Sequence, residues 1–386
     1  TGLPGPALFG VGAPFPGGTA STFFSRMSAP DAKKTKPSGG GVKAAVKTLA
    51  ANAQLSAEEA STAMREIMGG EASPAQVGAF LALLTLEKCS AEIVHSLADV
   101  MRSNALLVEV PRSEDLIVDI VGTGGDGQDT FNISTAAGLL AAGAGVRIVK
   151  HGNRAASSKS GAADILEALG ARLELTPAEV QPVLSAGNFA FLFARSYHPA
   201  MRHVGPIRLE LGIRTVFNIL GPLTNPAKPD AMVCGVYTES LGRLFVEVFK
   251  MLGMRRALVV HGCEGLDELS IAGPSKVWEL KEGGEIVEYQ VRPEDFGVAV
   301  HPLIEVAGNS PEENAQEMRE LLKGQGRLAV REMVLMNASA ALYVAGKVPN
   351  FKAGTEAAKA AMSNGSAVKT LEAYVSSSQG SAAPAM

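Results

Sequence analysis

Two loops with the residue types of an anion-binding site follow two consecutive predicted strands. The first loop, 122–127 (GTGGDG), comes directly after the apolar stretch 116–121. Glycine has no Cβ, so such a loop can adopt positive φ angles and bring its backbone amides close to a ligand. A helix is predicted from about Ser134, and the N–H groups and dipole at its N-terminus favour negative charge. We therefore expect an anion to bind where this strand ends.

The second loop, 150–161 (KHGNRAASSKSG), is rich in basic, amide and hydroxyl side chains. It follows a predicted strand at 146–149 and leads into a predicted helix at 162–169. Its glycine spacing and that of the first loop match neither the P-loop nor the dinucleotide-binding fingerprint. Two adjacent loops of this kind nevertheless indicate a ligand with more than one phosphate group.

An acidic pair, Asp267-Glu268, follows another predicted strand, at 256–261. Neighbouring carboxylates repel each other unless a cation lies between them. Mg²⁺ is usually bound by one or two carboxylates together with substrate phosphates. The pair is therefore either a magnesium site beside the phosphate loops or a solvated acidic loop.

The composition excludes several classes of protein. The 386-residue chain has a formal net charge of −4, so a broad basic surface for nucleic acid is not indicated. No apolar run approaches the roughly 18 residues needed to cross a bilayer, and no membrane association is expected. The cysteines are three, at 89, 234 and 263, without metal-type spacing, which predicts a reducing compartment rather than a disulfide framework.

The order of predicted elements indicates an α/β fold with two domains. Short helical segments predict a small all-helical N-terminal domain over 42–112, which helices from about 199–225 are expected to join. Residues 113–198 and 226–375 are expected to form a larger α/β domain with a mostly parallel central sheet covered by helices. Strands are predicted at 116–121, 146–149, 189–194, 231–237, 256–261, 277–280 and 286–291. Helices without evident chemistry are predicted at 311–323, 329–345 and 352–375.

Both ends of the chain differ in composition from the rest. Residues 1–41 are rich in small and hydroxyl residues and contain no acidic residue before Asp31. This segment is expected to be a disordered leader, and its composition is also that of an organellar transit segment. A transit segment would place the protein in a plastid, and otherwise a cytoplasmic location is expected. Residues 376–386 are expected to form a disordered tail.

Six motifs, in this order, resemble those of the anthranilate phosphoribosyltransferase family. They are GTGGD (122–126), NIST (132–135), KHGNRAASS (150–158), the region of Arg208, VFNILGPLTNP (216–226) and the Asp267-Glu268 pair. The resemblance extends from about residue 45 to 375. It implies a small helical domain and a larger α/β domain that close on each other, usually as a homodimer. It also implies transfer of phosphoribose from 5-phosphoribosyl 1-pyrophosphate to the amine of anthranilate, with Mg²⁺.

The resemblance also implies a role for individual positions. The phosphoribosyl donor would be bound by Gly122, Gly125, Asp126, Thr130, Asn132, Ser134, Thr135, Lys150, His151, Gly152, Asn153, Arg154, Ala155, Ala156, Ser157 and Ser158. Anthranilate would be bound by Gly122, Asn153, His198 and Arg208, with Arg208 on its carboxylate. Magnesium would be bound by Ser134, Asp267 and Glu268.

The sequence departs from the family pattern at two positions. Ala162 stands where many members have a serine that contacts the phosphate, and Met201 stands where some members have a tyrosine beside anthranilate. Two alternatives stay open, a pyrimidine nucleoside phosphorylase of the same superfamily and a non-catalytic nucleic-acid-binding paralogue. The acidic net charge and the intact loops favour an enzyme that binds small molecules and no nucleic acid.

Overall fold

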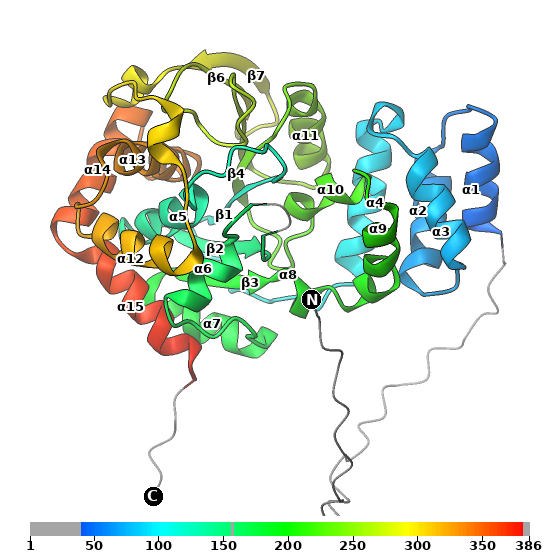
Figure 1. The fold of residues 1–386 in the computed structure, drawn as a ribbon, viewed down its shortest axis with the longest axis horizontal. Helices are drawn as coiled ribbons and strands as arrows, with labels where there is room; N and C mark the ends of the chain where they lie inside the picture. Colours follow the sequence, from blue (N-terminus) through cyan, green and yellow to red (C-terminus); the bar gives the residue numbers. More distant parts are fainter. Residues whose placement is uncertain (1–39, 156–157, 381–386) are drawn as a thin grey trace, which may run out of the picture. The chain divides into compact units, whose positions relative to one another are not determined.

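A computed structural model describes residues 40–155 and 158–380 of the chain (Figure 1). Its first four α-helices form a bundle, and residues at the starts of these helices favour helix formation. Ser56 and Ser73 each cap a helix through a reciprocal capping box with Glu59 and Gln76, respectively. Besides the short 3₁₀ helix η1 (Leu86–Lys88), the bundle consists of α1 (Gly41–Ala50), α2 (Ala57–Met68), α3 (Pro74–Leu83) and α4 (Ala91–Ser103).

A seven-stranded sheet is the centre of the larger domain, and its order is β3-β2-β1-β4-β5-β6-β7. The five strands from β1 to β5 run parallel, whereas β6 and β7 are antiparallel additions at one edge. All seven predicted strands are present, and the prediction of a mostly parallel sheet is confirmed. The strands are β1 (Ile117–Gly122), β2 (Arg147–Gly152), β3 (Phe189–Phe193), β4 (Ala231–Gly235), β5 (Arg256–Gly262), β6 (Ser275–Leu280) and β7 (Ile286–Val291).

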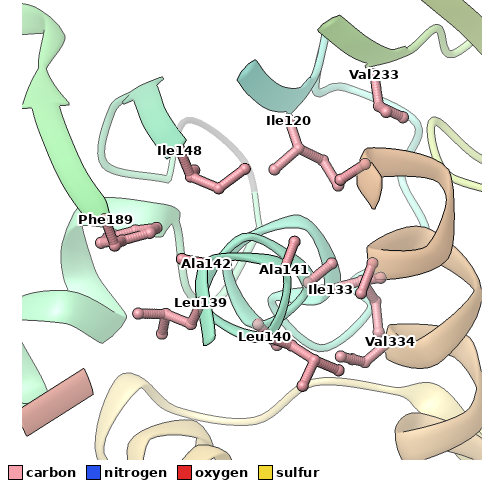
Figure 2. Close-up of a cluster of buried hydrophobic side chains, with 14 of the residues drawn as sticks. Ile120, Ile133, Leu139, Leu140, Ala141, Ala142, Ile148, Phe189, Val233 and Val334 are labelled. Carbon is pink, nitrogen blue, oxygen red and sulfur yellow. The ribbon is translucent and has the colours of Figure 1, made fainter. Parts of the chain in front are cut away.

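Helices cover both faces of the sheet because successive side chains of a strand point to opposite faces. On one face lie α5 (Ile133–Gly143) and α13 (Leu328–Val344), which pack on each other and on the central strands. Figure 2 shows Ile120 and Ile148 on the sheet side of α5, and Val334 of α13 beside Leu140. On the other face, α11 (Ser240–Met251) packs against β5 and β6 and contacts α4 of the bundle.

The segment after β3 connects the sheet to the helical bundle. Pro199 begins a helix, as expected, but it is the 3₁₀ helix η2 (Pro199–His203) rather than an α-helix. The α-helix that follows, α9 (Gly205–Leu211), packs against α3, and η2 packs against α2. The segment begins with α8 (Ala194–Tyr197), before η2, and ends with α10 (Phe217–Leu220) and η3 (Gly221–Leu223), of which α10 contacts α4.

The remaining helices pack around α5 and the strands next to it. Of these, α7 packs beside β3 and on α15, and α12 packs on α6. They are α6 (Ala162–Ala168), α7 (Pro177–Gly187), α12 (Pro311–Leu322), α14 (Phe351–Ser363) and α15 (Ser366–Ser378), with the 3₁₀ helices η4 (Pro293–Phe296) and η5 (Leu303–Val306). Among the described residues, no helix is long and apolar enough to cross a membrane.

Two boundary predictions near the C-terminus were wrong. The single helix expected at 352–375 is divided into α14 and α15, because Gly365 adopts a left-handed φ of +78°. The tail was expected to begin at residue 376, but α15 continues to Ser378, whose hydroxyl accepts a hydrogen bond from the backbone of Arg172 at 3.0 Å. Of the leader predicted at 1–41, residues 1–39 lie outside the described residues, as do 381–386, whereas Gly41 already begins α1.

The close approach of α5 and α15 predicts a stability defect. A Cβ added to Gly143 would lie 2.7 Å from the backbone Cα of Ala367, so Gly143→Ala forces the two helices apart. We expect the free energy of unfolding to fall by about 1–3 kcal/mol in urea denaturation. The matched control is Gly205→Ala in α9, where an added Cβ meets nothing within 4 Å. Equal stability of the two variants would contradict the packing argument.

Candidate active site

The candidate site lies at the carboxyl ends of β1 and β4. The chain passes from β1 outward to β2 and β3, and then returns to β4 and β5 on the opposite side of β1. Ligands of parallel sheets bind at such a reversal of strand order. Gly122 and Gly235 are paired there, and a Cβ on Gly122 would lie 2.3 Å from a carboxylate oxygen of Asp267. The absence of side chains on these glycines therefore allows the two loops to meet.

The acidic pair lies directly against the glycine loop. The Gly124 N–H donates to Oδ2 of Asp267 at 2.6 Å, although the two residues are 143 positions apart. The Asp267 N–H faces Oδ2 of Asp126 at 3.4 Å, and the Ser134 N–H donates to Glu268. The acidic turn, the glycine loop and the first turn of α5 thus form one continuous site.

The negative charge at this site is buried. Asp267 and Glu268 are each only 9% exposed. Burial raises the pKa of the Asp267 carboxyl, and the charge of Asp126 raises it further. The pKa of Glu268 is raised by burial and then by Asp267. A cation placed among these groups would offset both the cost of burying their charge and the repulsion between them.

The oxygens around the acidic pair suit a hard divalent cation. The Ser134 hydroxyl belongs to the same cluster, because its Oγ accepts from Nζ of Lys150 at 3.1 Å and Lys150 interacts electrostatically with both carboxylates. Carboxylate and hydroxyl oxygens are ligands that Mg²⁺ accepts. Within residues 40–155 and 158–380, no group of three or more His, Cys, Asp or Glu side chains is arranged to hold a metal ion.

Lys150 lies beneath the site rather than on its surface. It is 1% exposed, and its ammonium group donates to the backbone carbonyl of Ile120 as well as to Ser134. Burial lowers its pKa, and the carboxylates of Asp119, Glu268 and Asp267 oppose this effect. Lys150 is therefore positioned as a buried counter-charge to the acidic cluster.

Asp119, in the middle of β1, interacts electrostatically with Lys150. Its side chain is fully buried, and burial raises its pKa to about 6. Oδ2 of Asp119 accepts from Nδ2 of Asn225 at 2.8 Å, and Oδ1 accepts from the His151 N–H at 3.3 Å. Asp119 thereby links β1, the start of the second loop and the GPLTNP segment.

Asp164, in the first turn of α6, fixes the second loop at its middle and at its end. One oxygen, Oδ2, accepts from the N–H groups of Ala155 and Gly161, both at 2.9 Å. The Arg154 guanidinium forms ion pairs with Asp164 and with Glu167, at 3.0 and 2.7 Å. Arg154 is thus directed toward α6, where its charge is already paired.

Other predicted donor-site residues lie around these loops. Gly152 ends β2, where a Cβ would lie 2.8 Å from the ring of Phe191. Thr130 pairs with Ala307 in an isolated bridge. Asn153 and Ser158 are exposed, Gly125 has a φ of +78°, and Thr135 is buried in α5. The predictions for Ala156 and Ser157 lie outside the described residues.

Two buried histidines face each other on the acceptor side. The ring centroids of His151 and His198 are 5.1 Å apart. Burial lowers the pKa of His151 to about 3 and that of His198 to about 4, so both rings are neutral near pH 7. Nδ1 of His151 lies 3.3 Å from the carbonyl of Gly221, and Nε2 of each ring has no partner among the described residues.

Arg208 reaches the same segment from α9. It is half-buried, burial lowers its pKa, and its guanidinium lies 5.5 Å from the ring centroid of Phe217. Phe217 begins α10, which leads directly to the Gly221 carbonyl beside His151. Of the two departures from the family pattern, Ala162 begins α6 and Met201 lies in η2, both half-buried.

Three residues at the site were missed from the sequence. Arg214 donates to the carbonyl of Gly125 and lies 4.5 Å from the ring centroid of Tyr237. Asp119 did carry a signal, because an acidic residue inside an apolar strand must be paired when it is buried. Asn314, in the distant helix α12, contacts Asn132, and no local pattern indicated this.

The buried histidines predict sensitivity to acid. Both folded-state pKa values lie below the ordinary 6.5, so the unfolded chain binds more protons once the pH falls below that value. The free energy of unfolding should fall by up to about 1.4 kcal/mol per pH unit and histidine as the pH drops from 6.5 toward 4. We expect His198→Asn to give a shallower slope in urea denaturation over this range. A slope equal to that of the wild type would show that His198 does not cause the loss of stability in acid.

Comparison with protein families divides the chain into the same two domains as its fold, a helical bundle and an α/β domain. Residues 43–105 match a model described as the helical bundle domain of a glycosyl transferase family, and residues 114–368 match the a/b domain of that family. Anthranilate phosphoribosyltransferase of Rubrobacter xylanophilus is 45% identical over 331 residues, which cover 86% of this chain and 96% of that protein. The enzyme of Deinococcus radiodurans is also 45% identical, over 83% of this chain and 94% of the relative.

Solved structures give the same result. The anthranilate phosphoribosyltransferase of Thermus thermophilus is 45% identical and superposes with a TM-score of 0.81, covering 87% of this chain and 99% of that one. The enzyme of Saccharomyces cerevisiae, solved in complex with PRPP and Mg, is 32% identical with a TM-score of 0.81, over 89% and 99% of the two chains. From its two matched domains and these relatives, the chain belongs to the anthranilate phosphoribosyltransferase family.

Proposed function

We propose that this protein transfers phosphoribose from 5-phosphoribosyl 1-pyrophosphate to the amine of anthranilate, forming N-(5-phosphoribosyl)anthranilate and pyrophosphate. The observation that carries the proposal is the contact between Gly124 and Asp267. This contact joins an amide-rich loop that suits phosphates to a buried acidic pair that suits a divalent cation. The yeast relative solved in complex with PRPP and Mg supports the choice of these two ligands. Homodimer formation, which the resemblance implies, is a secondary proposal, as is a plastid location if residues 1–41 are a transit segment and a cytoplasmic location otherwise.

Mg²⁺ would be held by Ser134, Asp267 and Glu268. These groups fit the ion because two buried carboxylates with raised pKa values lack a sufficient counter-charge, and because all available ligand atoms are oxygens. When bound together with the donor, the ion would neutralise charge on the pyrophosphate. Lys150 would keep the Ser134 hydroxyl oriented toward the cluster through its 3.1 Å hydrogen bond.

The reaction exchanges one bond at the ribose for another. The bond from C1 to the pyrophosphate oxygen breaks, the anthranilate nitrogen forms a bond to C1, and one amine proton is lost. Amides of the glycine loop and the N-terminus of α5 stabilise the negative charge that grows on the leaving pyrophosphate. The amine of anthranilate is neutral near pH 7, so its placement in line with C1 supplies much of the rate.

The acceptor would lie between Arg208 and the two histidines. The guanidinium of Arg208 offers a planar pair of donors that matches a carboxylate. The rings of His151 and His198 are neutral, so each has one N–H donor and one acceptor nitrogen. Neutral rings add no positive charge beside the C1 atom, where positive charge develops during transfer.

The carboxylate role of Arg208 predicts a selective binding defect. Arg208→Ala should raise the KM for anthranilate about ten- to a hundredfold, because a charge-assisted pair of hydrogen bonds is lost. The KM for the donor should change little. The measurement is the Mg²⁺-dependent loss of anthranilate fluorescence when the donor is added. Arg202→Ala is the matched control, because Arg202 is exposed in η2. An unchanged KM in Arg208→Ala would remove this residue from the acceptor site.

The acidic pair predicts opposite effects on activity and stability. Asp267→Asn and Glu268→Gln should each raise the Mg²⁺ concentration needed for half-maximal rate by about tenfold or more, because a charged ligand is lost. In EDTA, the same variants should melt at the wild-type temperature or above it, because the buried repulsion is removed. Glu264→Gln, at an exposed position of the same loop, is the control and should alter neither quantity. Wild-type Mg²⁺ dependence in both variants would contradict the assigned metal site.

A further inference from the structure

Asn132 stands at the position where a side chain ordinarily caps the following helix. An N-cap asparagine usually accepts a hydrogen bond from an N–H group in the first helical turn. The Asn132 side chain makes no such bond to α5, whose first turn lies wholly within the described residues. Its Nδ2 instead donates to the carbonyl of Ser160 at 2.9 Å, and its Oδ1 accepts from the Ser160 hydroxyl at 3.1 Å.

Asn314 of α12 holds the Asn132 side chain in this orientation. The Asn314 side chain is 1% exposed, and its Nδ2 donates to Oδ1 of Asn132 at 3.1 Å. Its own orientation is set by the backbone of Asn309, because the Asn309 N–H donates to Oδ1 of Asn314 at 2.9 Å and can meet only an oxygen. The amide of Asn314 must therefore present its NH₂ group to Asn132.

We propose that Asn314 is a positioning residue for the phosphoribosyl-donor site. By holding the Asn132 amide against Ser160, it keeps that side chain from capping α5 and fixes the end of the second loop. The helix N-terminus then remains directed at the phosphates of the donor. The inference rests on the proposed function, because it assigns the consequence to donor binding.

Without Asn314, the Asn132 side chain could bond to the first N–H groups of α5 instead of to Ser160. Side-chain capping of a helix is favourable, so a released Asn132 would turn toward the first N–H groups of α5 and compete there with the donor phosphate. Ser160 would at the same time lose a fixed partner at the end of the second loop. Both changes weaken donor binding and leave the acceptor residues in place.

The test is a double-mutant cycle in the full chain with the fluorescence assay. Asn314→Ala should raise the KM for the donor about five- to tenfold, with the KM for anthranilate within about twofold of wild type. In an Asn132→Ala background, the same change should add less than about twofold, because Asn314 acts through Asn132. A general loss of packing would not show this dependence on Asn132.

Two further variants make the result decisive. Asn314→Asp keeps the shape and the bond from the Asn309 N–H but cannot donate to Asn132, so it should reproduce the rise in donor KM if Asn314→Ala does not fold. Asn309→Ala retains the backbone groups that hold Asn314 and should leave the donor KM unchanged. Wild-type donor KM in a folded Asn314 variant, or equal effects with and without Asn132, overturns the positioning role. Absence of transfer by the wild-type protein contradicts the proposed function instead.

Discussion

The burial of two adjacent carboxylates at the carboxyl end of the sheet is the constraint on which the site depends. Asp267 and Glu268 cannot both be charged in this position without nearby compensation, and their raised pKa values express that cost. The compensation available within the chain consists of backbone amides and the ammonium group of Lys150. The site is therefore organised in advance for additional positive charge.

The sheet topology brings the components of the site together. Because the strand order reverses beside β1, the loops after β1, β2 and β5 open at the same edge although they are far apart in the sequence. The paired glycines 122 and 235 allow the acidic turn to approach the backbone of β1 and β4. α5 is buried where it packs on β1, β2 and α13, and it gives the glycine loop a rigid base.

The donor and acceptor sides of the site are held by different parts of the fold. The donor loops are anchored by α6 and α12, through Asp164 and Asn314. Of the acceptor residues, His198 and Arg208 lie on the segment 194–226, whose helices η2, α9 and α10 pack on the N-terminal bundle. A relative movement of bundle and sheet would consequently displace Arg208 while leaving the donor loops intact.

The sequence by itself determined the elements whose signals are local. Capping boxes at Ser56 and Ser73, β-branched apolar runs and glycine-rich loops depend on neighbouring residues, so the strands and the bundle could be predicted. Even the break at Gly365 had a local signal, the Asn-Gly pair. Only the tertiary structure decided the partners of the polar side chains, such as the ion pairs of Arg154, the burial of Lys150 and the contact of Asn314 with Asn132. These partners depend on which polar groups are buried together when distant segments pack. The spacing of residues along the chain does not predict that.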